Sequence, residues 1–239
     1  MLDALFAQFE NLVVLDTETT GIDCRQDEII ELAALRVVKE GGACRIAEEM
    51  DPLVKLSAGR RLPPVIVNLT GITEQMLQQQ GQEKEAVCRQ FTALLNHPKT
   101  LLIAYNAQFD LCFLYYFLWR FGQTEVLKQI KMLDAMTIYK DRRAYPHKLE
   151  NAVEAYALET QNTHRAIDDT KAAFELLQAM ERERADLDQY INLFGYHPKY
   201  GVSGPRISSI TYLPQPYGGT RKLYEQRVPG ELVGQSSVW

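Results

Sequence analysis

The hydrophobic pattern begins with four apolar residues, Leu12-Val13-Val14-Leu15, that run directly into Asp16-Thr17-Glu18-Thr19-Thr20-Gly21. A short apolar run closed by a turn signal is typical of a buried β-strand. Side chains alternate between the faces of a strand, so Asp16 and Glu18 project from the same face. Adjacent carboxylates at the end of a core strand repel each other, and a bound divalent cation would compensate them. A solvated strand end that carries two acids is the alternative, and this pair alone does not decide between them.

Further apolar patterns predict strands that alternate with helices. Strands are expected at residues 29–38 and 44–54, joined by a tight turn at Gly41-Gly42, which gives an antiparallel meander with the first strand. Shorter strands are expected at 101–104 and 132–134, and helices at 83–96, 107–121, 149–158 and about 166–184. Thr73 is expected to cap a short helix, and Glu31 to be a partly exposed structural acid. This order of elements predicts an α/β fold with a mixed sheet.

Two further acids lie on predicted helices. In the strongly apolar helix 107–121, Asp110 lies on the apolar face, one turn before Leu114. A buried acid is costly unless it is paired, hydrogen-bonded at a helix start or bound to a metal. In the last helix, Asp169 lies about 70° from the centre of the apolar face and Asp168 about 170° away. We therefore expect Asp169 to border a cleft between helix and sheet and Asp168 to face water, although both acids also suit a helix start.

Composition is that of an ordinary globular protein of 239 residues, 46% hydrophobic and 24% charged. The formal charge of −5 lacks the basic character of a tight, non-specific nucleic-acid binder. Residues 195–239 nevertheless carry +3, so the preceding residues carry −8. The four scattered cysteines include no C-x-x-C pair, which disfavours a zinc site or a disulfide framework. With no secretory signal and no membrane-spanning apolar run, we expect a cytoplasmic protein without a membrane partner.

Three acidic motifs occur in order, and together they resemble those of a known family. They are Asp16-Thr17-Glu18-Thr19-Thr20-Gly21, Asn106-Ala107-Gln108-Phe109-Asp110 and His164-Arg165-Ala166-Ile167-Asp168-Asp169. Four carboxylates around one cleft would hold two hard cations that stabilise the oxygens of a phosphoryl displacement. A histidine with an ordinary pKa of about 6.5 could deprotonate the attacking water. Over residues 11 to about 183, the chain resembles the DnaQ-like, DEDDh-type 3′–5′ exonucleases of the ribonuclease H-like superfamily.

This resemblance implies a fold, a catalytic set and a cofactor. The fold is a ribonuclease H-like mixed five-stranded sheet flanked by helices, here with a C-terminal extension. The catalytic residues would be the general base His164 and four carboxylates that bind two Mg²⁺ or Mn²⁺ ions, namely Asp16, Glu18, Asp110 and Asp169. The family places the last acid five residues after the histidine, which selects Asp169 over Asp168, in agreement with the helical phase.

The resemblance also implies a substrate, the 3′ end of single-stranded or frayed nucleic acid, with DNA favoured over RNA. Hydrolysis of the terminal phosphodiester would release a nucleoside 5′-monophosphate, in proofreading or repair beside a replication or repair partner. Thr17, Glu18 and Thr70 are expected to contact the terminal nucleotide, and Asn106 to support the substrate site. Many relatives have histidine where this chain has Thr70.

Two alternatives stay open. The chain could be an exoribonuclease that trims RNA 3′ ends, because that choice rests on 2′-hydroxyl contacts, or an inactive nucleic-acid or partner-binding module. Residues 1–184 are expected to form the exonuclease domain, and 185–239 an extension of unknown role. Within the extension, segment 207–214 could add an edge strand. The aromatic residues around Lys199 could contact nucleic acid, but the sequence favours a packed or partly ordered tail over that contact.

Overall fold

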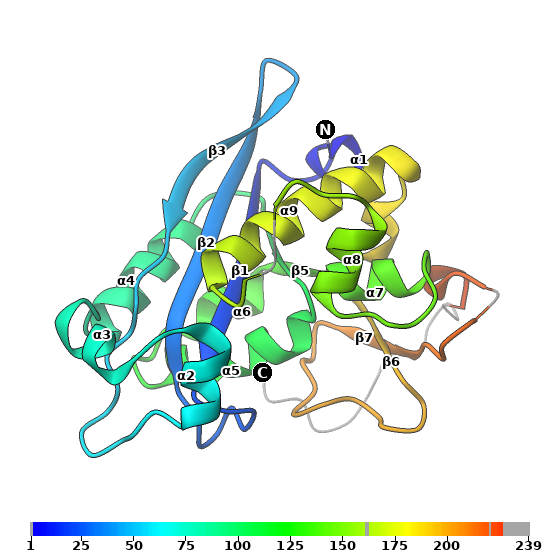
Figure 1. Cartoon of the computed structure of the whole chain (residues 1–239). Coiled ribbons are helices and arrows are strands. Elements are labelled where there is room, and N and C mark those ends of the chain that lie inside the picture. Colours follow the sequence, from blue (N-terminus) through cyan, green and yellow to red (C-terminus); the bar gives the residue numbers. More distant parts are fainter. Residues whose placement is uncertain (1, 161–162, 220, 227–239) are drawn as a thin grey trace.

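A five-stranded mixed sheet forms the centre of the molecule, with its strands in the order β3-β2-β1-β4-β5 (Figure 1). The computed structural model describes residues 2–160, 163–219 and 221–226. β2 is antiparallel to β1 and β3, whereas β4 and β5 run parallel to β1. The strands are β1 (Asn11–Thr19), β2 (Ile29–Glu40), β3 (Ala43–Met50), β4 (Thr100–Ala104) and β5 (Lys131–Asp134). The predicted ribonuclease H-like mixed sheet is therefore confirmed.

The predicted meander forms, but its third strand is shorter than the expected range 44–54. Gly41 and Gly42 have φ angles of 59° and 84°, which glycine adopts without steric cost, so the tight turn forms where the sequence predicts it. β3 ends at Met50, since Pro52 follows and has no N–H to donate to a strand ladder. The residues after Pro52 form isolated bridges instead.

Helices occur where the apolar pattern predicts them, within a few residues at each end. Thr73 caps α3 as expected, because its Oγ1 accepts a hydrogen bond of 3.2 Å from the Met76 N–H. No helix in the described ranges is both long and apolar enough to cross a membrane. The helices are α1 (Asp3–Phe6), α2 (Pro64–Thr70), α3 (Glu74–Gln79), α4 (Lys84–Leu95), α5 (Ala107–Trp119), α6 (Glu125–Gln129), α7 (Ala135–Lys140), α8 (Leu149–Ala155) and α9 (Ala166–Glu183), with the 3-10 turns η1 (Leu187–Tyr190) and η2 (Leu223–Gln226).

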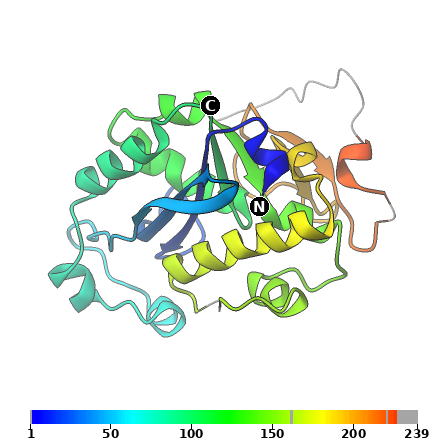
Figure 2. The ribbon, with the colours of Figure 1, turned by 90° about the horizontal axis from the view of Figure 1, so that it is seen from above.

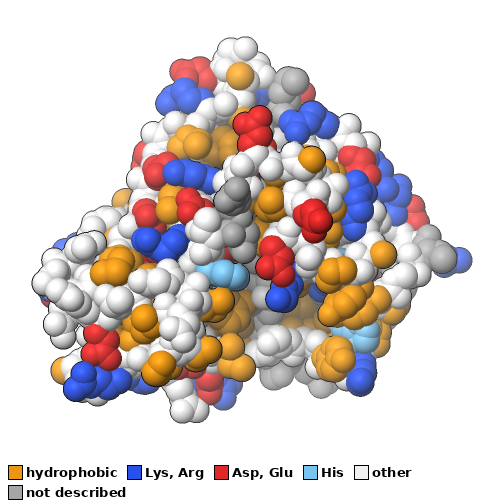
Figure 3. All heavy atoms as spheres, viewed as in Figure 1, with side chains coloured by type: hydrophobic (Ala, Val, Ile, Leu, Met, Phe, Trp, Pro, Cys, Tyr) orange, Lys and Arg blue, Asp and Glu red, His pale blue; other side chains and the backbone are white. Residues whose placement is uncertain are grey.

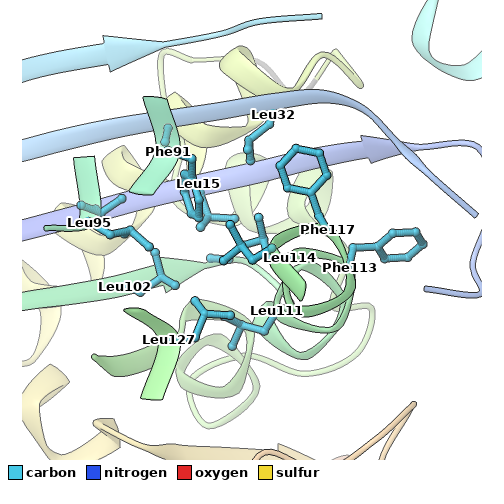
Figure 4. Packing of buried hydrophobic residues seen from close by; sticks show 14 of the residues in the cluster. Leu15, Leu32, Phe91, Leu95, Leu102, Leu111, Phe113, Leu114, Phe117 and Leu127 are labelled. Atoms are coloured by element: carbon cyan, nitrogen blue, oxygen red, sulfur yellow. The ribbon is translucent and has the colours of Figure 1, made fainter. Parts of the chain in front are cut away.

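Helices cover both faces of the sheet and bury β1 between them (Figure 2). On one face, Val13 and Leu15 of β1 pack in a cluster with α4 and α5. Figure 4 shows the core of this cluster, where Leu15 lies close to Leu114. On the other face, Leu12 and Val14 pack against α9 and α8. Strand alternation thus assigns odd and even residues of β1 to different helical layers.

The C-terminal segment packs into both hydrophobic clusters. Phe194, Ile207 and Tyr212 belong to the cluster of α4 and α5, and Leu187 and Leu213 to the cluster of α9. β6 (Leu193–Tyr196) and β7 (Thr211–Pro214) pair in parallel. β7 is an edge strand, as expected for segment 207–214, but it belongs to this separate two-stranded sheet. The described C-terminal residues therefore share their cores with the preceding part of the chain.

Truncation of a buried C-terminal side chain should destabilise the whole protein. Phe194 is 2% exposed, so Phe194→Ala is expected to lower the free energy of unfolding by about 3–5 kcal/mol. Because the cores are shared, urea denaturation followed by circular dichroism should show one transition. Tyr200→Ala is the control: Tyr200 is 70% exposed and should cost no more than about 0.5 kcal/mol. Separate unfolding of the C-terminal segment in Phe194→Ala would contradict the shared core.

Candidate active site

The carboxyl end of β1 places its acids in the layer that faces α9. Leu12 and Val14 point toward α9, so strand alternation continues this face through Asp16 and Glu18. Thr17 points to the opposite face, toward α5. The alternation that the sequence predicts therefore holds, and it separates the two acids from the residue between them.

Asp169 joins these acids from the first turn of α9. Carboxylate oxygens of Asp16, Glu18 and Asp169 lie within 4.8 Å of one another, and this trio is called the acidic cluster below. Asp169 is 6% exposed, so the expectation that it borders the cleft is confirmed. Asp168 is partly exposed and accepts a 2.6 Å hydrogen bond from Thr163 Oγ1. The helical phase thus separates the two neighbouring acids correctly.

The buried face of α9 is rotated from the one that the sequence predicts. Ile167 and Phe174 are only partly buried, whereas Ala166 and Thr170 are fully buried. The centre of the face therefore lies nearer to Asp169 than the apolar pattern suggests. The small side chains on this face allow close approach to β1, and a strictly apolar pattern does not detect threonine as a buried residue.

Asp110 reaches the same end of the sheet from α5, which directly follows β4. Both the N–H and the Oγ1 of Thr17 donate to Asp110 Oδ1, at 3.1 and 2.7 Å. Asp110 is 2% exposed, so its burial is compensated by hydrogen bonds, as one of the sequence alternatives requires. Asp110 therefore lies beside the end of β1, hydrogen-bonded to the residue between Asp16 and Glu18.

Burial and neighbouring negative charges raise the pKa values of Asp16, Glu18, Asp110 and Asp169. Burial, with the neighbouring charges of Asp110 and Asp169, holds the pKa of Asp16 well above its usual range. Burial, with the charge of Asp169, raises the pKa of Glu18 to about 8. Burial raises the pKa of Asp169 to about 7. It also raises the pKa of Asp110 to about 7, against the opposing effect of the Thr17 hydrogen bonds. The fully ionised site thus needs added positive charge.

Glu31 is a fifth acid at this position, and the expectation that it is partly exposed is wrong. Glu31 is 0% exposed, because the β1–β2 register places it opposite Glu18 and under the start of α9. Arg165 Nε donates to Glu31 Oε1 at 2.9 Å, and the Ala166 N–H donates to Oε2 at 2.8 Å. Glu31 therefore anchors the helix that carries Asp169. Its ion pair with Arg165 joins residues that are far apart in the sequence.

A cavity of about 490 Å³ opens over the acidic cluster. Figure 3 shows this face of the molecule, where histidine and hydrophobic side chains lie on both sides of a hollow. Residues from α7, α8 and the loop between them line one side, which no sequence motif indicated. Besides the acidic cluster and Asp110, the lining residues are Thr17, Leu69, Tyr105, Asn106, Phe109, Met136, His147, Lys148, Leu149, Glu150 and His164.

His164 and Asn106 both line the cavity in strained backbone conformations. Their φ angles are 57° and 64°, in the left-handed region that costs a non-glycine residue about 1–3 kcal/mol. Asn106 directly precedes α5, which carries Asp110. His164 lies two residues before the start of α9, which carries Asp169. The surrounding fold therefore holds both side chains at the cavity against their local backbone preference.

The residues expected to contact substrate divide into two groups. Glu18 and Asn106 line the cavity, as does Thr17, whose N–H and Oγ1 are engaged by Asp110. Thr70 is 4% exposed, and its Oγ1 donates to a carbonyl one turn earlier in α2 and accepts from the N–H of the residue two positions later. The neighbouring Leu69 lines the cavity instead. Thr70 therefore stabilises the end of α2, and Leu69 presents the side chain of this segment to the cavity.

The chain matches known exonucleases in sequence. The family model RNase_T, described as exonuclease, matches residues 13–177. DNA polymerase III PolC-type from Bacillus subtilis (strain 168) is 34% identical over an alignment of 181 residues, which covers 74% of this chain and 12% of that protein. The PolC-type polymerase of Thermotoga maritima is 33% identical over an alignment of 259 residues, gaps included, which covers 95% of this chain and 18% of that protein. The chain thus spans less than a fifth of the length of these relatives.

Solved structures of exonuclease I have the same fold. One is an exonuclease I structure that suggests how processivity is achieved in that protein. It superposes with a TM-score of 0.68 at 22% identity, over 76% of this chain and 43% of that chain. Escherichia coli exonuclease I in complex with a dA16 oligonucleotide has a TM-score of 0.66 at 21% identity, over 76% of this chain and 42% of that chain. At this identity, the likeness shows the fold alone.

The raised pKa values predict how pH and metal ions affect stability. Unfolded carboxyl groups titrate at a pKa of about 4, so the folded state binds these protons more tightly. That contribution to stability is fully present below about pH 4 and is lost as the pH rises through the pKa values of about 7 and 8 of Asp169 and Glu18. The melting temperature of metal-free protein should therefore fall from pH 6 to pH 9. Added Mn²⁺ should raise it, and more at pH 8 than at pH 6.

The control for this measurement is Asp169→Asn, which removes one charge from the cluster. In a differential scanning fluorimetry titration, this variant should lose most of the Mn²⁺ effect and show a shallower decline with pH. An Asp169→Asn protein with the parent's full Mn²⁺ shift would contradict the assignment of the acidic cluster as a metal site.

The Glu31–Arg165 pair can be tested by a double-mutant cycle. Arg165→Met leaves a buried carboxylate without its charged partner and should cost about 3 kcal/mol in the free energy of unfolding. Glu31→Gln keeps an acceptor for the Ala166 N–H and should cost about 1 kcal/mol. The double variant should be more stable than the sum predicts, with a coupling of at least about 1 kcal/mol in urea denaturation. Additive effects would show that the pair does not anchor α9.

Proposed function

The chain belongs to the RNase_T exonuclease family of DnaQ-like, DEDDh-type 3′–5′ exonucleases, and we propose that it acts on single-stranded or frayed DNA. It would remove nucleotides from the 3′ end and release nucleoside 5′-monophosphates. The observation that carries this proposal is the acidic cluster at the end of β1, whose oxygens lie within 4.8 Å of one another under an open cavity. His164 lines the same cavity, so a base and a set of metal ligands face one substrate.

The donor set fits hard divalent cations. Two such ions would be held by the four carboxylates of Asp16, Glu18, Asp110 and Asp169. An all-oxygen donor set suits Mg²⁺ and Mn²⁺ better than softer metals. The raised pKa values of these acids support this assignment, because uncompensated negative charge is what bound cations would neutralise. When bound, the ions would supply Lewis acidity and stabilise charge on the phosphodiester oxygens.

The protein's own residues would position the terminal nucleotide and move a proton. Leu69 and Phe109 present apolar surface to the cavity, and they suit the faces of the terminal base and sugar. The exposed Asn106 offers an amide to the substrate backbone. His164 would accept the proton of the attacking water as a general base. The left-handed backbone of His164 supports this role, since strain of this kind persists where function requires it.

The likeness to the relatives supports DNA as the substrate of this chain. The curated relatives are DNA polymerases by name, and one exonuclease I structure contains a dA16 oligonucleotide. This likeness supports a proofreading or repair role beside a replication or repair partner in the cytoplasm. The same residues could serve an exoribonuclease, because direct attack of water on the phosphodiester does not involve the 2′-hydroxyl, which is what distinguishes RNA from DNA. Parallel assays on DNA and RNA therefore belong to the test.

Neighbouring acids of α9 provide a matched test of the mechanism. Asp169→Asn should reduce exonuclease activity by roughly 10³-fold, since a catalytic metal contributes several kcal/mol to transition-state stabilisation. Asp168→Asn, on the same helix turn but outside the cluster, should stay within about threefold of the parent. The assay follows shortening of 5′-labelled single-stranded DNA, and of RNA of the same sequence, with Mg²⁺ or Mn²⁺. Equal activity of both variants would refute the proposed role of the cluster, and faster cleavage of RNA would favour the exoribonuclease.

A further inference from the structure

We propose that a row of aromatic side chains beside the cavity binds the single strand upstream of its 3′-terminal nucleotide. This row, called the aromatic track below, consists of Tyr145, His147, Tyr217, His197 and Tyr200. The inference rests on the proposed function and extends it, because it assigns a substrate-binding role to the C-terminal segment. The ligand is single-stranded nucleic acid, recognised through the faces of its bases.

The rings of the track follow one another without a gap. The His147 ring centroid lies 5.8 Å from that of Tyr145 and 5.2 Å from that of Tyr217. Tyr145 and Tyr217 are also in contact, at 5.0 Å. From Tyr217 the row continues to His197 at 4.5 Å and from there to Tyr200 at 5.0 Å. Residues from two distant parts of the sequence thus form one aromatic surface.

The track begins at the active-site cavity. His147 lines that cavity, and it is held there because its carbonyl accepts a 2.8 Å hydrogen bond from Tyr105 Oη, another lining residue. Hydrophobic and histidine side chains gather beside the hollow on the face shown in Figure 3. A strand whose 3′ end lies over the acidic cluster could therefore leave the cavity past His147 and continue along the track.

The tyrosines of the track are largely exposed to solvent, although they contact the other rings of the track. Tyr145, Tyr200 and Tyr217 are 65%, 70% and 46% exposed. Large aromatic side chains normally bury most of their surface, and an exposed group of them indicates an interaction site. Bases stack on such rings irrespective of their identity, and an enzyme that removes successive nucleotides needs this tolerance.

The C-terminal segment holds its half of the track in place. Gln215 Nε2 donates to Thr137 O at 2.9 Å and to Asp141 Oδ1 at 2.7 Å. These bonds tie the end of β7 to α7 two residues before Tyr217. The pairing of β6 with β7 similarly fixes Tyr196, directly before His197. The rings therefore lie on a supported scaffold, which lowers the entropy lost when a strand binds.

Charge at both ends of the track suits a polyanion. Lys199 lies over the Tyr200 ring, with its Nζ 5.2 Å from the ring centroid. Lys148 lines the cavity beside His147; its side chain is 79% exposed, and its Nζ lies 3.4 Å from Glu150 Oε1 in an exposed ion pair. Ammonium groups beside stacking rings bind phosphates as the bases stack, the combination that single-strand binders use. An acidic chain can in this way hold a nucleic acid locally.

The experiment compares long and short substrates in a variant of the track. Tyr145→Ala/Tyr217→Ala should weaken binding of an oligothymidylate of about 20 nucleotides by roughly 5- to 100-fold, as expected for the loss of base stacking. Binding is measured by fluorescence anisotropy without divalent cations, so that the strand is not cleaved. Cleavage of a thymidine dinucleotide with Mn²⁺ should stay within about twofold of the parent, because a dinucleotide in the cavity does not extend past His147 to Tyr145 and Tyr217, which do not line the cavity.

Trp119→Ala is the matched control, because Trp119 is 64% exposed at the end of α5 opposite to the cavity, and it should leave both measurements unchanged. Unchanged binding of the long strand in the track variant, or equal losses on long and short substrates, would overturn the inference. A parent protein that binds the long strand through the track but cleaves neither substrate would instead refute the proposed function. An oligouridylate of the same length distinguishes RNA from DNA as the preferred strand.

Discussion

Electrostatic repulsion at the carboxyl end of β1 is the constraint on which the site depends. Asp16, Glu18, Asp169 and Glu31 converge there, and Arg165 is the cation that pairs with one of them. The protein holds these charges together because β1 is buried between two helical layers and cannot move away. The raised pKa values of Asp16, Glu18 and Asp169 are a consequence of this crowding and burial. Bound cations would relieve it, so the same repulsion that disfavours the empty site favours the metal-bound one.

The two faces of β1 divide the structural and chemical tasks. On the α9 face, the acids are drawn together, and the pair of the buried Glu31 with the partly exposed Arg165 ties the first turn of that helix to β2. On the α5 face, Thr17 holds Asp110 through two hydrogen bonds. Thr17 thus connects the acidic cluster to Asp110, which lines the same cavity. The site owes its precision to the rigid core beneath, since every acid is carried by a strand or a helix rather than by a long loop.

The C-terminal segment is part of the same molecular body. It contributes side chains to both cores and places Tyr217 and His197 beside the cavity rim at His147. The match to the exonuclease family model ends at residue 177. Tyr217 and His197 therefore lie outside the matched residues.

Local patterns in the sequence determined the five strands, the main helices and the position of each motif. Strand alternation put Asp16 and Glu18 on one face, and helical phase separated Asp169 from Asp168, because both periodicities act over a few residues. Only the tertiary structure decided that Glu31 is buried, since its partner Arg165 is 134 residues away in the sequence. It also decided that Leu69 rather than Thr70 lines the cavity, and that His147 meets Tyr217 there. Contacts of this kind follow from how the layers pack, and packing is set by the whole chain rather than by any one segment.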